Sequence, residues 1–135
     1  MKQAFTLAEL TIVIVIIAIL VAIAIPQFTK IQERAKISAA VSKLDMIRKA
    51  EAIYHSLYDV YTTSLDNLSQ EVPEVAPNKI NDSDWAFTIN STNLTRNFTA
   101  IATRLRGRRA GFNITINELG ELGGDHPERP SIWLK

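Results

Sequence analysis

Glu9 is the only charged residue between Phe5 and Thr29, in a stretch that is otherwise largely apolar. An ionised carboxylate at the centre of a membrane-spanning helix costs about 2.5–3.5 kcal/mol, and less toward the helix end. The chemistry open to this group is pairing with a cation, because opposite charges attract strongly where the dielectric constant is low. A helix that served only as an anchor would not need the charge, so we expect Glu9 to find its partner in another copy of the chain. The alternative is a carboxylate that reaches the water at the membrane surface.

A basic cluster surrounds Gly107, where the sequence predicts a hairpin turn. Guanidinium groups bind phosphates, which makes the cluster a candidate contact for DNA. No aromatic residues that would stack on bases are interleaved with the arginines, however, and the formal net charge of the chain is only +1. We therefore interpret the cluster as a solvated loop, with DNA binding as the alternative, and do not expect nucleic acid among the partners. The cluster consists of Arg104, Arg106, Arg108 and Arg109.

Asparagines that begin an Asn-x-Ser/Thr sequence are the third candidate for chemistry, because this sequence is the acceptor for N-glycosylation. The composition of the chain predicts about one such site by chance, and six are present. Asparagine and threonine also gather in turns and on exposed strand faces. We interpret the excess as a polar exposed surface, with glycosylation of at least one site as the alternative. The sites are Asn67, Asn81, Asn90, Asn93, Asn97 and Asn113.

The sequence does not support catalysis or metal binding. His55 and His126 are the only histidines and cysteine is absent, so no cluster of these residues has metal-ligand spacing. A Gly-x-Ser-x-Gly motif is also missing. We therefore predict that the protein is not an enzyme and needs neither a cofactor nor a metal.

The element that must position Glu9 is an apolar helix. Residues 12–25 are all apolar, and residues 5–25 would span about 31 Å as a helix, close to the hydrocarbon thickness of a bilayer. A cleaved secretory signal peptide is the alternative, but the small-residue cleavage pattern is missing and helical periodicity follows directly. Proline removes a helical hydrogen bond, so we expect Pro26 to kink or locally melt the helix between Ala22 and Pro26, chiefly during assembly.

From Lys30 the sequence becomes amphipathic, and we expect one helix to run from Phe5 to about Tyr58. An apolar stripe at spacings of three and four predicts the face that packs on a core. It consists of Ile37, Val41, Leu44, Ile47, Ala50, Tyr54, Leu57 and Tyr58. The opposite, charged face is expected to carry Lys36, Lys43, Asp45, Arg48, Lys49 and Glu51.

The remainder of the chain predicts a loop and a sheet. Residues 69–84 contain two prolines and several turn-forming residues, which indicates a connecting loop. Three alternating runs follow, at residues 85–89, 98–102 and 112–116. The expected fold class is α+β, with the long N-terminal helix packed against a small antiparallel sheet of three or four strands.

The N-terminal segment resembles the type IV pilins and the pseudopilins of type II secretion. Precursors in this family carry a short basic leader, then Phe-Thr-Leu-Ile-Glu and an apolar helix, and here Phe5-Thr6-Leu7-Ala8-Glu9 follows a four-residue leader. The resemblance implies that a prepilin peptidase cleaves between Ala4 and Phe5 and that the new N-terminus at Phe5 is methylated. It also implies that Glu9 pairs with the amino terminus of a neighbouring subunit, and Pro26 matches the family's helix-kinking proline.

Several positions depart from the family pattern. Ala4 replaces the usual glycine, Ala8 replaces a bulky aliphatic residue, and Ala18 stands where many members have glycine. The segment Tyr61–Leu65 and the strands after it also look similar to the family. Major pseudopilins have a calcium-binding loop near the C-terminus, but its motif is missing here, and we interpret the carboxylates in that region as a solvated turn. They are Glu118, Glu121, Asp125 and Glu128.

The expected organisation has four parts: a leader at residues 1–4, a membrane and filament-core helix at 5–29, an amphipathic helix at 30–60, and a globular loop-and-sheet domain at 61–135. The resemblance implies a structural subunit of a type IV pilus-like filament, assembled by packing of N-terminal helices after leader cleavage. Its partners would be identical subunits, the prepilin peptidase, the inner-membrane assembly platform and, before assembly, the membrane itself. The precursor would lie in the inner membrane, and the filament would lie outside the bacterial cell.

Two alternatives remain open. The first is the major pseudopilin of a type II secretion system, which shares this N-terminus. The second is a membrane-anchored binding module that never polymerises, and it predicts an uncleaved leader and tolerance of Glu9→Ala. The sequence does not separate adhesion, motility, DNA uptake and secretion as roles for a filament.

Overall fold

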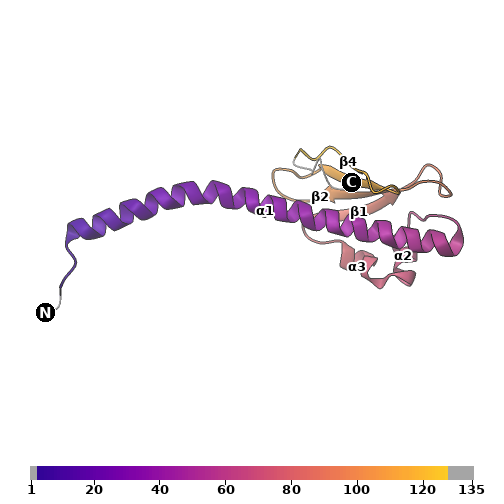
Figure 1. Cartoon of the computed structure of the whole chain (residues 1–135), viewed down its shortest axis with the longest axis horizontal. Helices are drawn as coiled ribbons and strands as arrows, with labels where there is room; N and C mark the ends of the chain where they lie inside the picture. Colours follow the sequence, from indigo (N-terminus) through magenta and orange to yellow (C-terminus); the bar gives the residue numbers. More distant parts are fainter. Residues whose placement is uncertain (1–2, 128–135) are drawn as a thin grey trace. The chain divides into compact units, whose positions relative to one another are not determined.

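The computed structural model describes residues 3–127 (Figure 1). The chain divides into two compact units, the first ending at Ala35 and the second beginning at Lys36. Helix α1 (Leu7–Tyr58) runs through both units, close to the predicted bounds. In the first unit its side chains are exposed almost throughout, which is unusual for so apolar a sequence.

The second unit contains a four-stranded antiparallel sheet, as predicted, in the order β1-β2-β3-β4. The strands are β1 (Trp85–Asn90), β2 (Thr99–Arg104), β3 (Asn113–Asn117) and β4 (Leu122–Gly123). Consecutive strands are neighbours throughout, and Figure 1 shows the sheet lying along the later part of α1. Buried residues alternate with partly buried or exposed residues along β1 and β3, which is why an alternating sequence pattern predicted these strands.

The core forms where the inner face of the sheet meets α1. Ile37, Leu44 and Ile47 of the helix are buried together with Phe87, Ala102 and Ile116 of the strands. Because α1 and the sheet bury complementary faces in one cluster, the second unit has the layered α+β arrangement that the sequence predicts.

The predicted faces of α1 need two corrections. Leu57 and Tyr58 are more than half exposed, so the buried stripe ends near Tyr54, which is only partly buried. Glu51 was expected on the charged outer face, but it is fully buried. It lies one residue after buried Ala50, and its carboxylate accepts a hydrogen bond from the Thr62 N–H at 3.1 Å. Burial is tolerated because this carboxylate binds the chain segment that follows the helix.

The loop predicted at residues 69–84 is wrong over most of its length. The structure has α2 (Leu65–Glu71), the 3-10 helix η1 (Pro73–Val75) and α3 (Pro77–Ile80). The Ser64 side chain caps α2 by accepting from the Asn67 N–H. Each of the two prolines stands in the first turn of its short helix, where the missing N–H has no cost.

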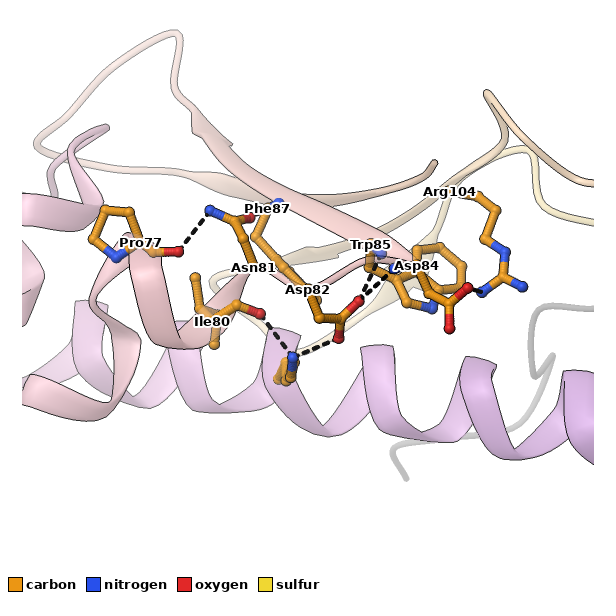
Figure 2. A network of polar contacts seen from close by, with 9 residues as sticks. Pro77, Ile80, Asn81, Asp82, Asp84, Trp85, Phe87 and Arg104 are labelled. Atoms are coloured by element: carbon orange, nitrogen blue, oxygen red, sulfur yellow. Dashed lines mark hydrogen bonds and ion pairs between the residues drawn. The ribbon is translucent and has the colours of Figure 1, made fainter. Parts of the chain in front are cut away.

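Polar contacts fix the entry to β1 (Figure 2). The Asp82 carboxylate accepts from the N–H groups of Asp84 and Trp85, each at 2.8 Å. Lys43 of α1 donates to the other Asp82 oxygen at 2.7 Å and to the Ile80 carbonyl at 2.8 Å. The start of the sheet is thus attached to α1 by a pair of charges as well as by the core.

Gly124 provides a test of this packing. Its φ is +101°, and a Cβ atom at this position would lie 2.3 Å from the Asn113 carbonyl oxygen. We expect Gly124→Ala to lower the free energy of unfolding by at least about 2 kcal/mol, since both backbone strain and a backbone clash oppose it. Denaturant unfolding of the full chain in detergent measures the loss. Gly111→Ala is the matched control, because φ is +90° but nothing lies within 4 Å; an equal loss in both variants would contradict the steric explanation.

Candidate functional site

Glu9 and Thr6 form a reciprocal cap at the start of α1. The Glu9 Oε2 atom accepts from the Thr6 N–H at 2.8 Å and from the Thr6 hydroxyl at 2.9 Å. In return the Glu9 N–H donates to the Thr6 hydroxyl oxygen at 3.2 Å. This is a capping box, in which the residue before the helix and the third helical residue satisfy each other's donors.

The cap is a role for Glu9 that the sequence analysis missed, although Thr6-x-x-Glu9 ahead of an apolar run is its known signal. Both donors from Thr6 are neutral, so the hydrogen bonds orient the carboxylate without neutralising its charge. The cap therefore fixes where the negative charge stands, at the first turn of the helix. That a cation from another subunit pairs with Glu9 stays a prediction.

The segment around the predicted cleavage point is accessible. Residues 3–6 precede the helix and belong to no regular element, and Phe5 is 84% exposed. Met1 and Lys2 of the predicted leader lie outside the described residues. Exposed segments without regular structure are preferred sites of proteolysis, and cleavage by a prepilin peptidase stays a prediction.

By length and composition α1 can cross a membrane. Its apolar residues from Leu10 to Ile25 expose about half of their surface, so the first unit has no interior to cover them. Helical structure is continuous through Pro26, whose carbonyl accepts from the Thr29 hydroxyl at 3.0 Å. A kink or local melting at Pro26 stays a prediction about the assembled filament.

The four clustered arginines do not share one surface. Arg104 is 3% exposed, lies over the Trp85 ring at 5.1 Å from its centroid, and donates to the Arg106 carbonyl at 3.0 Å. It also pairs with Asp84 at 3.6 Å. The reason is its register, because Arg104 continues the inward row of Ala100 and Ala102 along β2. Arg106 and Arg108 are exposed and Arg109 is half-buried.

One of the six Asn-x-Ser/Thr sites lies within a strand, and its spacing matches the geometry of the sheet. The spacing of two residues in Asn-x-Thr equals the side-chain period of a strand, so both polar residues of a strand site face the same side. Asn113 and Thr115 of β3 are such a pair, on the face away from the core. Asn81 has both amide ends occupied, since it donates to the Pro77 carbonyl and accepts from the Phe87 N–H (Figure 2).

The other four sites lie outside the interior of the strands. Asn67 is exposed on α2, Asn90 ends β1, and Asn93 and Asn97 stand in the loop between β1 and β2. The Asn97 side-chain oxygen accepts several hydrogen bonds within that loop. Glycosylation at Asn67, Asn90 or Asn93, the exposed members of this group, stays a prediction.

The acidic residues near the C-terminus have separate partners. Glu121 accepts from the Asn117 amide at 2.7 Å, and Asp125 accepts from the Asn113 N–H at 2.6 Å. Glu128 lies outside the described residues. In the part of the chain between residues 3 and 127, no group of three acidic, His or Cys side chains is placed to hold a metal ion.

Comparison with known proteins gives the class of this chain. No family model matches it. It is 32% identical over 117 residues to the type IV narrow pilus major component PilA5 of Thermus thermophilus, covering 85% of this chain and 97% of that protein. It is also 47% identical over 61 residues to the type IV major pilin protein PilA of Myxococcus xanthus, covering 45% of this chain and 28% of that protein.

The chain belongs to the type IV pilin family. This follows because the first relative is matched over nearly its whole length, including the small domain as well as the apolar helix. It is a structural subunit of a type IV pilus.

Proposed function

We propose that copies of this chain form the filament by packing their N-terminal helices together. The observation that carries the proposal is the exposed apolar half of α1, whose side chains are not covered by any of the described residues of the first unit. Moving this surface from lipid into contact with identical helices exchanges one apolar environment for another. The cap holds the negative charge of Glu9 at a fixed place on the helix. In a stack of helices, a cation from a neighbouring subunit can then pair with Glu9 at only one axial position.

Processing would supply that cation. Cleavage between Ala4 and Phe5 by a prepilin peptidase creates a new amino group at Phe5, and N-methylation leaves it cationic. The amino group of one subunit then neutralises Glu9 of a neighbour, which makes the pair a device for axial register. Before cleavage the same helix holds the precursor in the inner membrane, beside the assembly platform.

A pilus is favoured over a secretion pseudopilus, because both relatives described above are named as pilus components. The proposed organisation keeps a leader at residues 1–4, a filament-core helix at 5–29, an amphipathic helix at 30–60 and an outward domain at 61–135. In this arrangement the outward domain carries whatever surface interactions the filament makes.

Labelling a single introduced cysteine tests whether the chain reaches surface filaments. The chain has no cysteine, and Arg108 is exposed in the turn between β2 and β3. We expect Arg108→Cys cells treated with a fluorescent maleimide to show labelled filaments, whereas wild-type cells show none. Label that stays in the cell envelope of Arg108→Cys cells would contradict export into a filament and favour the anchored-module alternative.

A further inference from the structure

A polar cleft of about 360 Å³ lies at one end of the sheet, between the β1–β2 loop and the end of β3. The cleft is open to solvent, so a ligand in it would be covered on one side only. The described residues that line the cleft carry amides, hydroxyls and one carboxylate, from Glu118, and include neither a cation nor an apolar side chain. Such a lining disfavours anionic and apolar ligands.

The floor of the cleft is a cross-strand row. Asn90 of β1 is paired with Thr99 of β2, and Thr99 is paired with Asn117 of β3. The neighbouring residues Ile89, Ala100 and Ile116 are buried in the core, so the row faces the opposite side of the sheet. Directly paired residues are about 5 Å apart. Asn90 and Thr99 present their side chains along this row, whereas the Asn117 amide is bound to Glu121 and Leu119 in the turn after β3.

The loop that forms one wall is held by its own hydrogen bonds. The Asn97 side-chain oxygen accepts from the N–H groups of Thr92 and Asn93, each at 3.3 Å. Ser91 donates to the Asn97 carbonyl at 2.6 Å, and the Tyr61 N–H donates to the Leu94 carbonyl at 2.7 Å. The wall is therefore ordered before a ligand arrives, which lowers the entropy lost on binding.

Several polar groups in the cleft are available to a ligand. Within the part of the chain that the structure describes, the side chains of Asn90 and Thr99 make no hydrogen bond. The Glu118 carboxylate receives a single long hydrogen bond, from the Phe98 N–H at 3.4 Å. An amide, a hydroxyl and a carboxylate together offer donors and acceptors to a ligand that has both.

We propose that this cleft binds one sugar unit of a neutral polysaccharide. Each sugar hydroxyl donates and accepts, which matches Asn90 and Thr99, and the two oxygens of Glu118 accept from adjacent hydroxyls. The cleft offers no aromatic ring for a sugar to stack on, so one site binds weakly. A filament repeats the site along its length, and multivalent attachment then gives firm binding. The multivalent part rests on the proposed filament function.

Retention of filaments on immobilised polysaccharides tests the site. We expect sheared wild-type filaments to be retained on at least one of dextran, mannan and galactomannan, and to be released by the free monosaccharide. Thr99→Val and Glu118→Gln should lower the retained fraction at least tenfold. Thr103→Val is the matched control, because Thr103 lies on the same face of β2 as Thr99 but at the other end of the strand. Filaments of this variant should be retained as well as wild-type filaments.

A second measurement does not depend on filaments. Ligand-observed NMR of the full chain in detergent micelles should detect binding of methyl glucoside, methyl mannoside or methyl galactoside at millimolar concentration, and Thr99→Val should abolish it. Lack of binding in both experiments, equal binding by Thr99→Val, or binding that EDTA removes would overturn the proposal, the last in favour of a cation site. If the chain forms no filaments but still binds the methyl glycosides, the result would support the sugar site and contradict only the proposed filament function.

Discussion

Glu9→Gln is expected to abolish filaments while the subunit still inserts into the membrane. Glutamine at this position keeps a side-chain oxygen for the Thr6 donors, so the capping box survives and only the negative charge is lost. The amino terminus of the neighbouring subunit is then left without its counter-ion. Breaking such a low-dielectric pair costs about 3–5 kcal/mol, which corresponds to more than a hundredfold loss of correctly stacked subunits. Electron microscopy of the sheared fraction measures filament yield.

Two companion variants separate the charge from the cap. Glu9→Ala removes both, and we expect it to resemble Glu9→Gln. Thr6→Val removes the hydroxyl that caps Glu9 but keeps the charge, and we expect shorter or fewer filaments rather than none, because losing a cap costs about 1 kcal/mol. Normal filament yield from Glu9→Gln would assign Glu9 to the cap alone and remove the register role.

The free energy of unfolding is expected to fall as the pH rises from 5 to 8, because of Glu51. Burial raises the pKa of Glu51 to about 7, from an ordinary value of 4.5, while the hydrogen bond from Thr62 opposes the shift. The unfolded chain therefore loses this proton at a lower pH than the folded chain. The contribution of Glu51 is most favourable below about pH 4.5 and is lost progressively up to about pH 7, by on the order of 3 kcal/mol.

Glu51→Gln should flatten this pH dependence and leave the variant more stable than wild type at pH 8. Urea unfolding of the full chain in detergent, between pH 5 and pH 8, measures both effects. Glu74→Gln is the control, because Glu74 is exposed on η1 and should keep the wild-type slope. Identical slopes for wild type and Glu51→Gln would show that Glu51 is ionised in the folded protein throughout this range.

Periodicity predicted the main elements because apolar side chains decide which face of each element is buried. The helix to Tyr58 and the three longer strands were found in this way, within a few residues of their bounds. The short helices after α1 were missed, because their stability comes from caps and from packing of Leu68, Val75 and Ile80 rather than from a long repeat.

Buried ionisable side chains were the residues that sequence patterns placed wrongly. Glu51 and Arg104 stand at inward positions but have ionisable side chains, and only the fold shows their partners. Glu51 binds the Thr62 N–H, and Arg104 lies between Trp85 and Asp84. A sequence does not reveal such partners when they are far away along the chain.

The features of the candidate sites also differ in how far the sequence alone predicts them. The prediction that Glu9 needs a cation rests on its position in an apolar run, since desolvation of a charge is a local property, and it stays a prediction. The cap that Thr6 forms with Glu9 could also have been predicted from the sequence, because both residues lie within one helical turn. The polar cleft could not have been predicted from the sequence. Its residues Asn90, Thr99 and Asn117 lie on three different strands and come together only in the folded sheet.

The mass of the N-terminal peptide from filaments sheared off the cell surface tests the proposed assembly most directly. We expect a peptide that begins at N-methylated Phe5, because the amino group that neutralises Glu9 exists only after the leader is removed. A peptide that begins at Met1, in filaments built from this chain, would contradict the proposal. It would show that assembly proceeds without the Phe5 amino group and that Glu9 is neutralised in some other way.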